Sequence, residues 1–180
     1  LSLERNSVSL GIRCRWGMRN ALFYVAKDSS SDEKDKVLGV AMWMPPRPVE
    51  LKETWGEWFE NWKLWTQQVG MNLYYGRGGL NVKAEAQSEI WTDPKGYYFL
   101  NIMVVLPGAQ GKGIGKALAG EVTKRADQEG IKCYLESSRD IPNMKIYEAM
   151  GFHFVKGMDC EDGGDVCKLF CMVRDPKPIG

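Results

Sequence analysis

The chain has 180 residues, of which 44% are hydrophobic and 26% are charged, and its formal net charge is +1. This length suits one domain with one core. A charge so close to neutral disfavours a nucleic-acid or membrane surface that is recognised through bulk electrostatics. No apolar run approaches the roughly 18 residues of a membrane-spanning helix, and the sequence predicts no signal peptide.

The cysteines do not follow a metal-binding or disulfide pattern. They are odd in number, none forms a CxxC pair, and the single histidine, His153, has no ligand-spaced partner. We therefore expect no metal site and reduced thiols, as in the cytoplasm or the nucleus. A nucleophilic Cys–His pair is a minor alternative, because Cys133 falls in an apolar segment typical of a buried strand. The five cysteines are Cys14, Cys133, Cys160, Cys167 and Cys171.

The first half of the chain predicts a hairpin followed by helical segments. Residues 21–28 and 36–44 are predicted strands that a polar, charged turn joins, and the proline-rich segment after them ends the second strand. Helical spacing of aromatic residues predicts a helix over 49–70 that Gly70 ends. A second helix is predicted over 80–91. The apolar positions of the first helix are Leu51, Trp55, Trp58, Phe59, Trp62 and Trp65.

The second half of the chain alternates strands and helices. Residues 97–106 form a nearly continuous apolar run, typical of a strand buried on both faces. A helix is predicted from Gly113 to Gly130, because apolar residues recur every four positions between them. A strand over 131–138 and a short helix between Pro142 and Gly151 follow. Segments 152–158 and 165–174 then predict a closing hairpin.

The stretch LPGAQGKGIGKAL, residues 106–118, predicts a phosphate-binding loop. Glycines let the backbone approach a ligand, and the first amides of a helix lack internal partners and carry the positive end of its dipole. The stretch fits neither the P-loop nor the Rossmann pattern. It does fit the pattern Q/R-x-x-G-x-G/A, over Gln110, Gly111, Lys112, Gly113, Ile114 and Gly115.

From about residue 96 to 173 the chain resembles the GNAT superfamily of acetyl-CoA-dependent N-acetyltransferases, as a small domain of fungal type. FLNIMVVLPGAQGKGIGKAL is similar to the family's fourth strand, pyrophosphate loop and next helix. CYLESS is similar to its fifth strand, NMKIYEAMGF to its N-x-x-x-Y-E-x-x-G-F segment, and CKLFCMVR to its last strand. The hairpin over 21–44 is similar to its second and third strands.

The resemblance implies an α/β (α+β) GNAT fold for a single N-acetyltransferase domain over 1–180. Its twisted sheet would be mostly antiparallel with one splayed parallel pair, and helices would cover both faces. Two departures stand out. Only about 20 residues precede the first hairpin, too few for the family's usual first strand and two helices. A helical insertion, residues 45–96, separates the family's third and fourth strands, and we expect it to cover the acceptor site.

The resemblance also implies the site residues. Loop amides from Gln110 to Lys116 would hold the pyrophosphate of acetyl-CoA. The backbone of Met103, Val104 and Val105 would pair with the pantetheine arm, and a free N–H at Val105 would face the thioester oxygen. Asn143 would contact the pantetheine or the acetyl group, and Tyr147 would protonate the leaving thiolate. Glu136 is the candidate general base, with Glu89 or a water chain as alternatives.

Each of these assignments has a purely structural alternative. Tyr147 would be a core aromatic, Asn143 a helix N-cap, Glu136 a hydrogen-bonding carboxylate, and the tryptophan stripe a core face. The predicted acceptor is a small-molecule amine, and the predicted protein is a monomer or homodimer with no nucleic-acid, membrane or metal partner. Acetylation of a protein or peptide, and a non-catalytic acyl-CoA-binding module, remain alternative functions.

Overall fold

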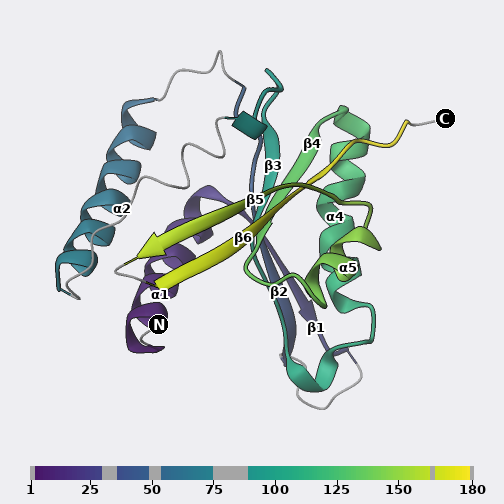
Figure 1. The fold of residues 1–180 in the computed structure, drawn as a ribbon, viewed down its shortest axis with the longest axis horizontal. Helices are drawn as coiled ribbons and strands as arrows, with labels where there is room; N and C mark the ends of the chain where they lie inside the picture. Colours follow the sequence, from purple (N-terminus) through teal and green to yellow (C-terminus); the bar gives the residue numbers. More distant parts are fainter. Residues whose placement is uncertain (1–2, 30–35, 49–53, 75–88, 163–164, 179–180) are drawn as a thin grey trace.

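The computed structural model describes residues 3–29, 36–48, 54–74, 89–162 and 165–178. It contains a six-stranded sheet in the order β1-β2-β3-β4-β6-β5. Helices α4 and α5 lie on one face of the sheet, and α1 and α2 lie on the other (Figure 1). The elements are α1 (Leu3–Asn20), β1 (Leu22–Lys27), β2 (Val37–Met44), α2 (Trp55–Tyr74), β3 (Tyr97–Val105), the 3-10 turn η1 (Pro107–Ala109), α4 (Ile114–Glu129), β4 (Lys132–Ser137), α5 (Asn143–Glu148), β5 (His153–Asp162) and β6 (Asp165–Arg174).

The sheet has the topology that the sequence predicts. Only the β3–β4 pair is parallel among the described strands, and the other four pairs are antiparallel. Most strand and helix bounds agree with the predicted ones to within a few residues. Helix α2 runs from Trp55 through Gly70 to Tyr74, so the prediction that Gly70 ends it is wrong. Strand β5 continues beyond 158 to Asp162. The predicted helix over 80–91 falls mostly outside the described residues. The observed sheet has the mostly antiparallel α+β architecture with one parallel pair that the resemblance implies.

Helix α1 is an element that the sequence reading did not predict. Gly11 and Gly17 both lower its intrinsic helix propensity. Gly17 is nevertheless buried, and a Cβ there would lie 2.2 Å from the sulfur of Met42 and 3.2 Å from the ring of Phe23. The residue that weakens the helix pattern is therefore the one that lets α1 approach β1 and β2.

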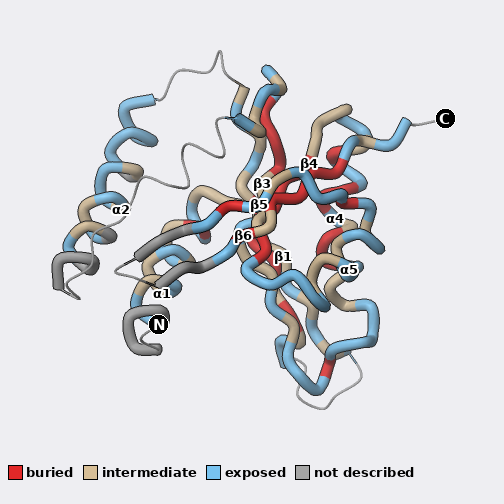
Figure 2. The backbone as a smooth tube through the Cα atoms, in the orientation of Figure 1, coloured by how far each residue is buried: buried red, intermediate tan, exposed pale blue. Residues whose placement is uncertain are grey.

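Two buried clusters lie on opposite faces of the sheet, where Figure 2 shows the buried segments concentrated. The larger cluster packs Leu118 and Val122 of α4 against strand residues such as Leu135. The smaller one includes Tyr97 and Tyr134. Because successive side chains of a strand point to opposite faces, neighbouring residues of β3 and β4 belong to different clusters.

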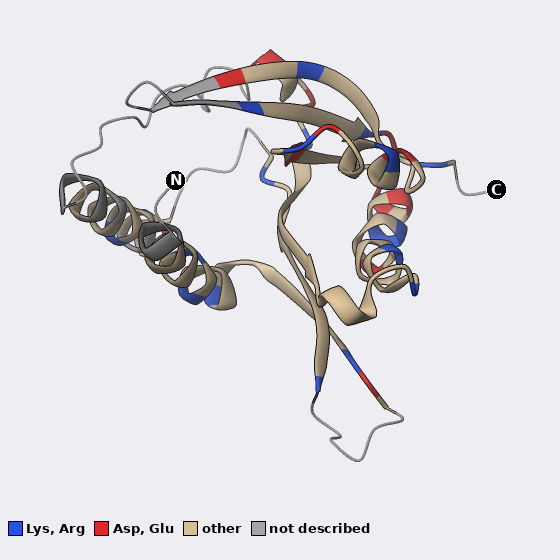
Figure 3. Cartoon of the chain, turned by 60° about the horizontal axis from the view of Figure 1, so that its bottom comes forward, with Lys and Arg blue, Asp and Glu red and all other residues tan. Residues whose placement is uncertain are grey.

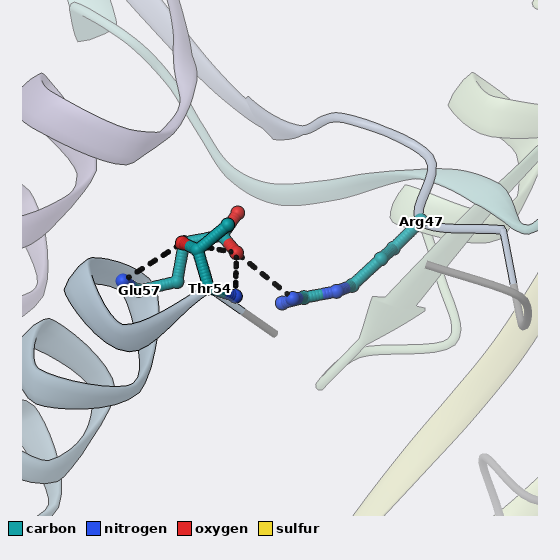
Figure 4. Close-up of polar contacts among 3 residues, drawn as sticks. All are labelled: Arg47, Thr54 and Glu57. Carbon is teal, nitrogen blue, oxygen red and sulfur yellow. Dashed lines mark hydrogen bonds and ion pairs between the residues drawn. The ribbon is translucent and has the colours of Figure 1, made fainter. Parts of the chain in front are cut away.

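Helix α2 begins at a capping box whose side chains also reach the strand connection before it (Figure 4). The Thr54 amide and hydroxyl both donate to Glu57 Oε2 at 2.9 Å, and the Glu57 amide donates to Thr54 Oγ1 at 3.3 Å. Arg47 donates to the same carboxylate oxygen at 3.2 Å. These hydrogen bonds lower the pKa of Glu57. They connect the start of α2 to the segment that leaves β2.

The aromatic stripe of α2 is exposed, so its interpretation as a core face is wrong. Trp55 is 86% exposed, and the other members are between 49% and 56% exposed. Helix α2 instead packs on α1, and Leu64 lies between the two helices beside Ile12 and Trp16. The rings stack along the helix, with Trp58 and Trp62 nearly parallel at 6.4 Å between centroids. The stripe consists of Trp55, Trp58, Phe59, Trp62 and Trp65.

A buried ion pair joins the end of β6 to α4. Arg174 is 4% exposed, and its two terminal nitrogens donate to the two Asp127 oxygens at 2.8 Å each. The amide of Lys177 donates to Asp127 Oδ1 at 2.7 Å. The Arg174 hydrogen bonds are the main reason why the pKa of Asp127 is lowered.

We expect Asp127→Asn to lower the free energy of unfolding at pH 7 by about 3–5 kcal/mol, because it leaves a buried guanidinium without its counter-charge. A lowered native pKa stabilises the fold above the ordinary aspartate value of about 4 and ceases to do so as the pH falls through the native pKa. The difference between wild type and variant should therefore shrink below about pH 4. Urea unfolding at several pH values measures it.

The matched control is Asp175→Asn, which removes the exposed ion pair with Lys132 (3.2 Å) at the same end of the sheet. An exposed pair contributes about 1 kcal/mol or less. Equal losses in the two variants would contradict a special role for the buried pair.

Candidate functional site

The site is built around the place where β3 and β4 separate, which we call the splay. Their parallel pairing runs from Tyr97↔Lys132 to Leu100↔Leu135 and ends there, although both strands continue. A β-bulge at Asn101 interrupts the pairing of β3 with β2 at the same level. Bulges bend a strand and increase its twist. The β3 backbone from Asn101 onward therefore has no β4 residue in register with it.

A cleft of about 600 Å³ opens on the α4–α5 face of the splay. Met103 and Val105 line it from β3, the glycine loop lines it from the start of α4, and α5 closes the far side. The lining residues are Met103, Val105, Ala109, Gln110, Gly111, Gly113, Ile114, Gly115, Lys116, Arg139, Pro142, Asn143, Ile146, Tyr147, Ala149 and Met150.

The glycine loop leaves helix amides uncapped at this cleft. Gly113 is the N-cap of α4 with φ +78°, and no side chain caps the helix. The first helical hydrogen bond inside α4 runs from the Ala117 amide to the Gly113 carbonyl at 2.9 Å. Gly111 also has a positive φ, and a Cβ at either glycine would meet no atom within 4 Å. These glycines therefore allow the positive φ angles of the loop, and without side chains they leave its amides accessible, as an anion site requires.

The other loop residues divide between the cleft and its rim. Gln110 donates through Nε2 to the Val105 carbonyl at 3.2 Å, which fixes the loop to the end of β3. Lys116 lines the cleft, whereas the exposed Lys112 does not. Val104 is 51% exposed and does not line the cleft either. Figure 3 shows basic and acidic residues interleaved along α4, so the loop provides a local rather than an extended positive field.

Asn143 is the first residue of α5 and not its N-cap, so the N-cap interpretation is wrong. The N-cap is Pro142, and no side chain caps the helix. The Asn143 amide instead lies 3.4 Å from the hydroxyl of the buried Ser137, at the end of β4. Ser137 also bonds the backbone of Arg139 in both directions, at 2.7 Å to its carbonyl and 3.3 Å from its amide. This network fixes the turn that carries Asn143 to the cleft wall.

Tyr147 lies one helical turn after Asn143 and lines the same cleft. Its ring makes an edge contact with Phe152, at 6.1 Å between centroids, and packs against the larger buried cluster. Burial raises the pKa of the phenol, which therefore stays protonated at neutral pH. The residue thus packs against the larger cluster and also lines the cleft, with its phenol protonated.

Glu136 lies at the splay but on the opposite face of the sheet from Tyr147. It is the first β4 residue beyond the last pair with β3, and it shares its face with Tyr134. The Tyr134 hydroxyl lies 3.1 Å from Glu136 Oε1. Glu89, the alternative base, forms an ion pair with Lys156 and does not line the cleft.

Several lining residues were missed by the sequence reading. Ile146 lies between Asn143 and Tyr147 on α5, Met150 lies two residues beyond the end of α5, and Arg139 follows β4. The spacing of three and four residues between Asn143, Ile146 and Met150 was the available signal, because such residues share one helix face. Arg139 has no comparable signal, since its place depends on the turn that Ser137 organises.

A nucleophilic pair of Cys133 and His153 does not fit the geometry. Cys133 is fully buried, and burial raises the pKa of its thiol to about 12. His153 is exposed on β5, with Nδ1 3.9 Å from the Asp175 carboxylate. In the part of the chain that the structure describes, no three His, Cys, Asp or Glu residues group as metal ligands, and no helix has the length and apolarity to cross a membrane.

The chain belongs to the Acetyltransferase (GNAT) family, which it matches over residues 12–152. Members of this family are acyltransferases that use acetyl-CoA, and the predicted family is confirmed. An uncharacterized N-acetyltransferase of Schizosaccharomyces pombe is 31% identical over 88 residues. That match covers 47% of this chain and 37% of the yeast protein, so the chain matches well under two thirds of this relative's length.

Solved structures share the fold at low identity. One is a structure from Corynebacterium glutamicum described as histone acetyltransferase HPA2 and related acetyltransferase, which is 18% identical to this chain. The match covers 99% of this chain and 80% of the Corynebacterium chain, with a TM-score of 0.61. Arabidopsis thaliana NAA60, solved with acetyl-CoA, is 14% identical, covering 87% of this chain and 76% of its own, with a TM-score of 0.56.

Proposed function

We propose that this protein transfers the acetyl group of acetyl-CoA to an amine, by direct attack within a ternary complex, and that the acceptor is a small molecule. The observation that carries the proposal is the arrangement at the splay. Uncapped helix amides and a protonated phenol lie on one face of it. A carboxylate lies on the other face. A thioester between them would have an acid near its sulfur and a carboxylate near the incoming amine.

In this proposal the loop amides from Gln110 to Lys116 bind the pyrophosphate, and Lys116 adds a positive charge. The β3 backbone over Met103 to Val105 pairs with the pantetheine arm, in the place that β4 leaves open. Asn143 contacts the arm from the opposite wall. The cleft of about 600 Å³ has the size of a small-molecule site, and its walls are mostly apolar with a few polar groups.

The proposed reaction requires two proton movements. The amine nitrogen bonds to the thioester carbon, the carbon–sulfur bond breaks, and the departing thiolate takes the proton of Tyr147. The nitrogen loses its extra proton to Glu136, directly or through water. A backbone N–H near Val105 stabilises the oxyanion while it exists. The cycle ends when the phenolate and the carboxylic acid exchange protons with solvent.

Protein or peptide acetylation is the second candidate acceptor class. The exposed aromatic stripe of α2 favours it, because aromatic residues are enriched in protein contacts. The similarity to a histone acetyltransferase points the same way, although it is a likeness of fold. A non-catalytic acyl-CoA-binding module is disfavoured, since mere binding needs no proton donor at the sulfur. Thiol release from acetyl-CoA with polyamines, arylalkylamines, aminosugars, amino acids and peptides separates these classes.

We expect Gly113→Glu to weaken acetyl-CoA binding at least about tenfold, or roughly 1.4 kcal/mol. The variant puts a carboxylate at the uncapped helix start and a side chain at a positive φ. Isothermal titration measures the affinity. Gly108→Glu adds the same charge in η1, outside the cleft lining, and should bind as the wild type does. Equal affinities in the two folded variants would remove the loop from the binding site.

We expect Tyr147→Phe to lower kcat by about 10²–10⁴-fold, the usual contribution of general acid catalysis. The phenyl ring keeps the contact with Phe152, so acetyl-CoA affinity and the melting temperature should change little. Steady-state kinetics beside a melting curve tests this. A loss of less than about threefold would mean that water or another group protonates the thiolate.

We expect Trp62→Ala to raise KM for the amine and to leave KM for acetyl-CoA unchanged, if the insertion over 45–96 covers the acceptor. Because Trp62 is 49% exposed, the loss of unfolding free energy should stay within about 1 kcal/mol. Trp43→Phe, in the fully buried core, is the contrast for stability. An unchanged amine KM would place the acceptor away from α2.

A further inference from the structure

The face of the sheet that carries Glu136 also carries a packed group of rings, the aromatic cluster of Trp91, Tyr97, Phe99 and Tyr134. Trp91 lies at its centre, with ring centroids 5.7, 5.9 and 5.6 Å from those of Tyr97, Phe99 and Tyr134. Phe99 and Tyr134 are 5.3 Å apart. Tyr134 is 0% exposed, so its ring has no freedom to turn away.

The Tyr134 hydroxyl lies at the edge of this cluster, between two polar partners. Glu136 Oε1 lies at 3.1 Å and Cys171 Sγ at 3.2 Å. A phenol has one proton to donate, and a carboxylate is a far stronger acceptor than a thiol sulfur. The proton therefore points to Glu136, and the thiol of Cys171 faces a lone pair of the hydroxyl. Burial raises the pKa of Tyr134 well above its ordinary value, so the donor keeps its proton.

The carboxylate that this hydroxyl holds stands at the splay. Tyr134 and Glu136 are two residues apart on β4, so they share one face, and Leu135 between them makes the last pair with β3. The Ser137–Asn143 network lies directly after Glu136. A carboxylate on a partly exposed strand end has several rotamers, and a fixed donor selects one of them.

We propose that Tyr134 is a positioning residue, whose phenol, fixed by the aromatic cluster and by Cys171, holds the Glu136 carboxylate at the splay in the orientation that receives the acceptor's ammonium group. This inference rests on the proposed function, because it gives Glu136 a role in binding and deprotonating the amine. Tyr134 touches neither substrate and acts through Glu136.

The experiment compares Tyr134→Phe with Tyr97→Phe. Both variants remove one hydroxyl from the same cluster, but the Tyr97 hydroxyl donates to the Ile90 carbonyl at 3.1 Å and not to a carboxylate. The acceptors are spermidine, phenethylamine, glucosamine and a hexapeptide with an N-terminal alanine, and the assay is CoA release. We expect Tyr134→Phe to lower kcat/KM for the amine about tenfold, with KM for acetyl-CoA unchanged. Tyr97→Phe should stay within about twofold of the wild type at a similar melting temperature.

Glu136→Gln shows whether Tyr134 acts through the carboxylate. If it does, Tyr134→Phe causes little further loss in the Glu136→Gln background. A full additional loss in that background would overturn the inference, and so would equal kinetics for Tyr134→Phe and Tyr97→Phe. Full activity of Glu136→Gln would also overturn it, while the proposed acetyl transfer would still stand on the Gly113 and Tyr147 variants.

A second measurement does not depend on the acceptor. The hydroxyl proton of a buried phenol exchanges slowly, so proton NMR should show a downfield resonance that Tyr134→Phe removes and Glu136→Gln shifts. If none of the four amines is acetylated, the proposed acceptor class fails. The resonance would still show whether the Tyr134 hydroxyl donates to Glu136. The inference would be overturned if this resonance were absent, or if its chemical shift were the same in Glu136→Gln as in the wild type.

Discussion

The end of β3–β4 pairing at Leu100 and Leu135 is the constraint on which the rest of the site depends. Parallel strands that continued side by side would bury their backbone groups in each other and leave no entrance between them. The bulge at Asn101 turns β3 away at the level where β4 still continues for two residues. The cleft opens at this separation on the α4–α5 face, and Glu136 lies at the same level on the opposite face.

The two faces of the sheet then acquire different chemistry from the alternation of side chains. On β4, Leu135 packs toward α4, while Tyr134 and Glu136 point to the other face. The uncapped amides of α4 and the phenol of Tyr147 therefore approach the splay from one face, and the carboxylate approaches it from the other. In the proposed reaction, acetyl-CoA and the amine enter from opposite faces and meet at the splay without competing for the same space.

The insertion has a different physical character from the rest of the chain. Within it, the capping box and Arg47 fix the start of α2, which packs along its side on α1. The aromatic stripe is left exposed, although stripes at helical spacing usually form core. Helix α1 covers this face of the sheet, with Gly17 close to Met42, and α2 packs on α1.

The sequence by itself determined the elements whose signals are local. Short stretches of sequence predict β3 from its apolar run, α4 from its four-residue periodicity, and the loop from its glycines. The helical spacing of Asn143 and Tyr147 likewise predicts the face of α5 that lines the cleft. These elements include most of the cleft, and the motif order made the fold family predictable.

Only the tertiary structure decided what depends on contacts between distant segments. Helix α1 was not predicted, and the close approach of Gly17 to Met42, a contact between distant segments, is seen only in the folded chain. The Asn143 side chain lies near Ser137 and not at a cap, Arg139 reaches the cleft through a turn, and the aromatic stripe stays exposed. The alternation of side chains along β4 puts Glu136 on the face of the sheet opposite Tyr147. The register of β4 against β3 puts Glu136 at the level where the two strands separate. A one-residue change in where β3 and β4 part would alter both, and no local pattern records that position.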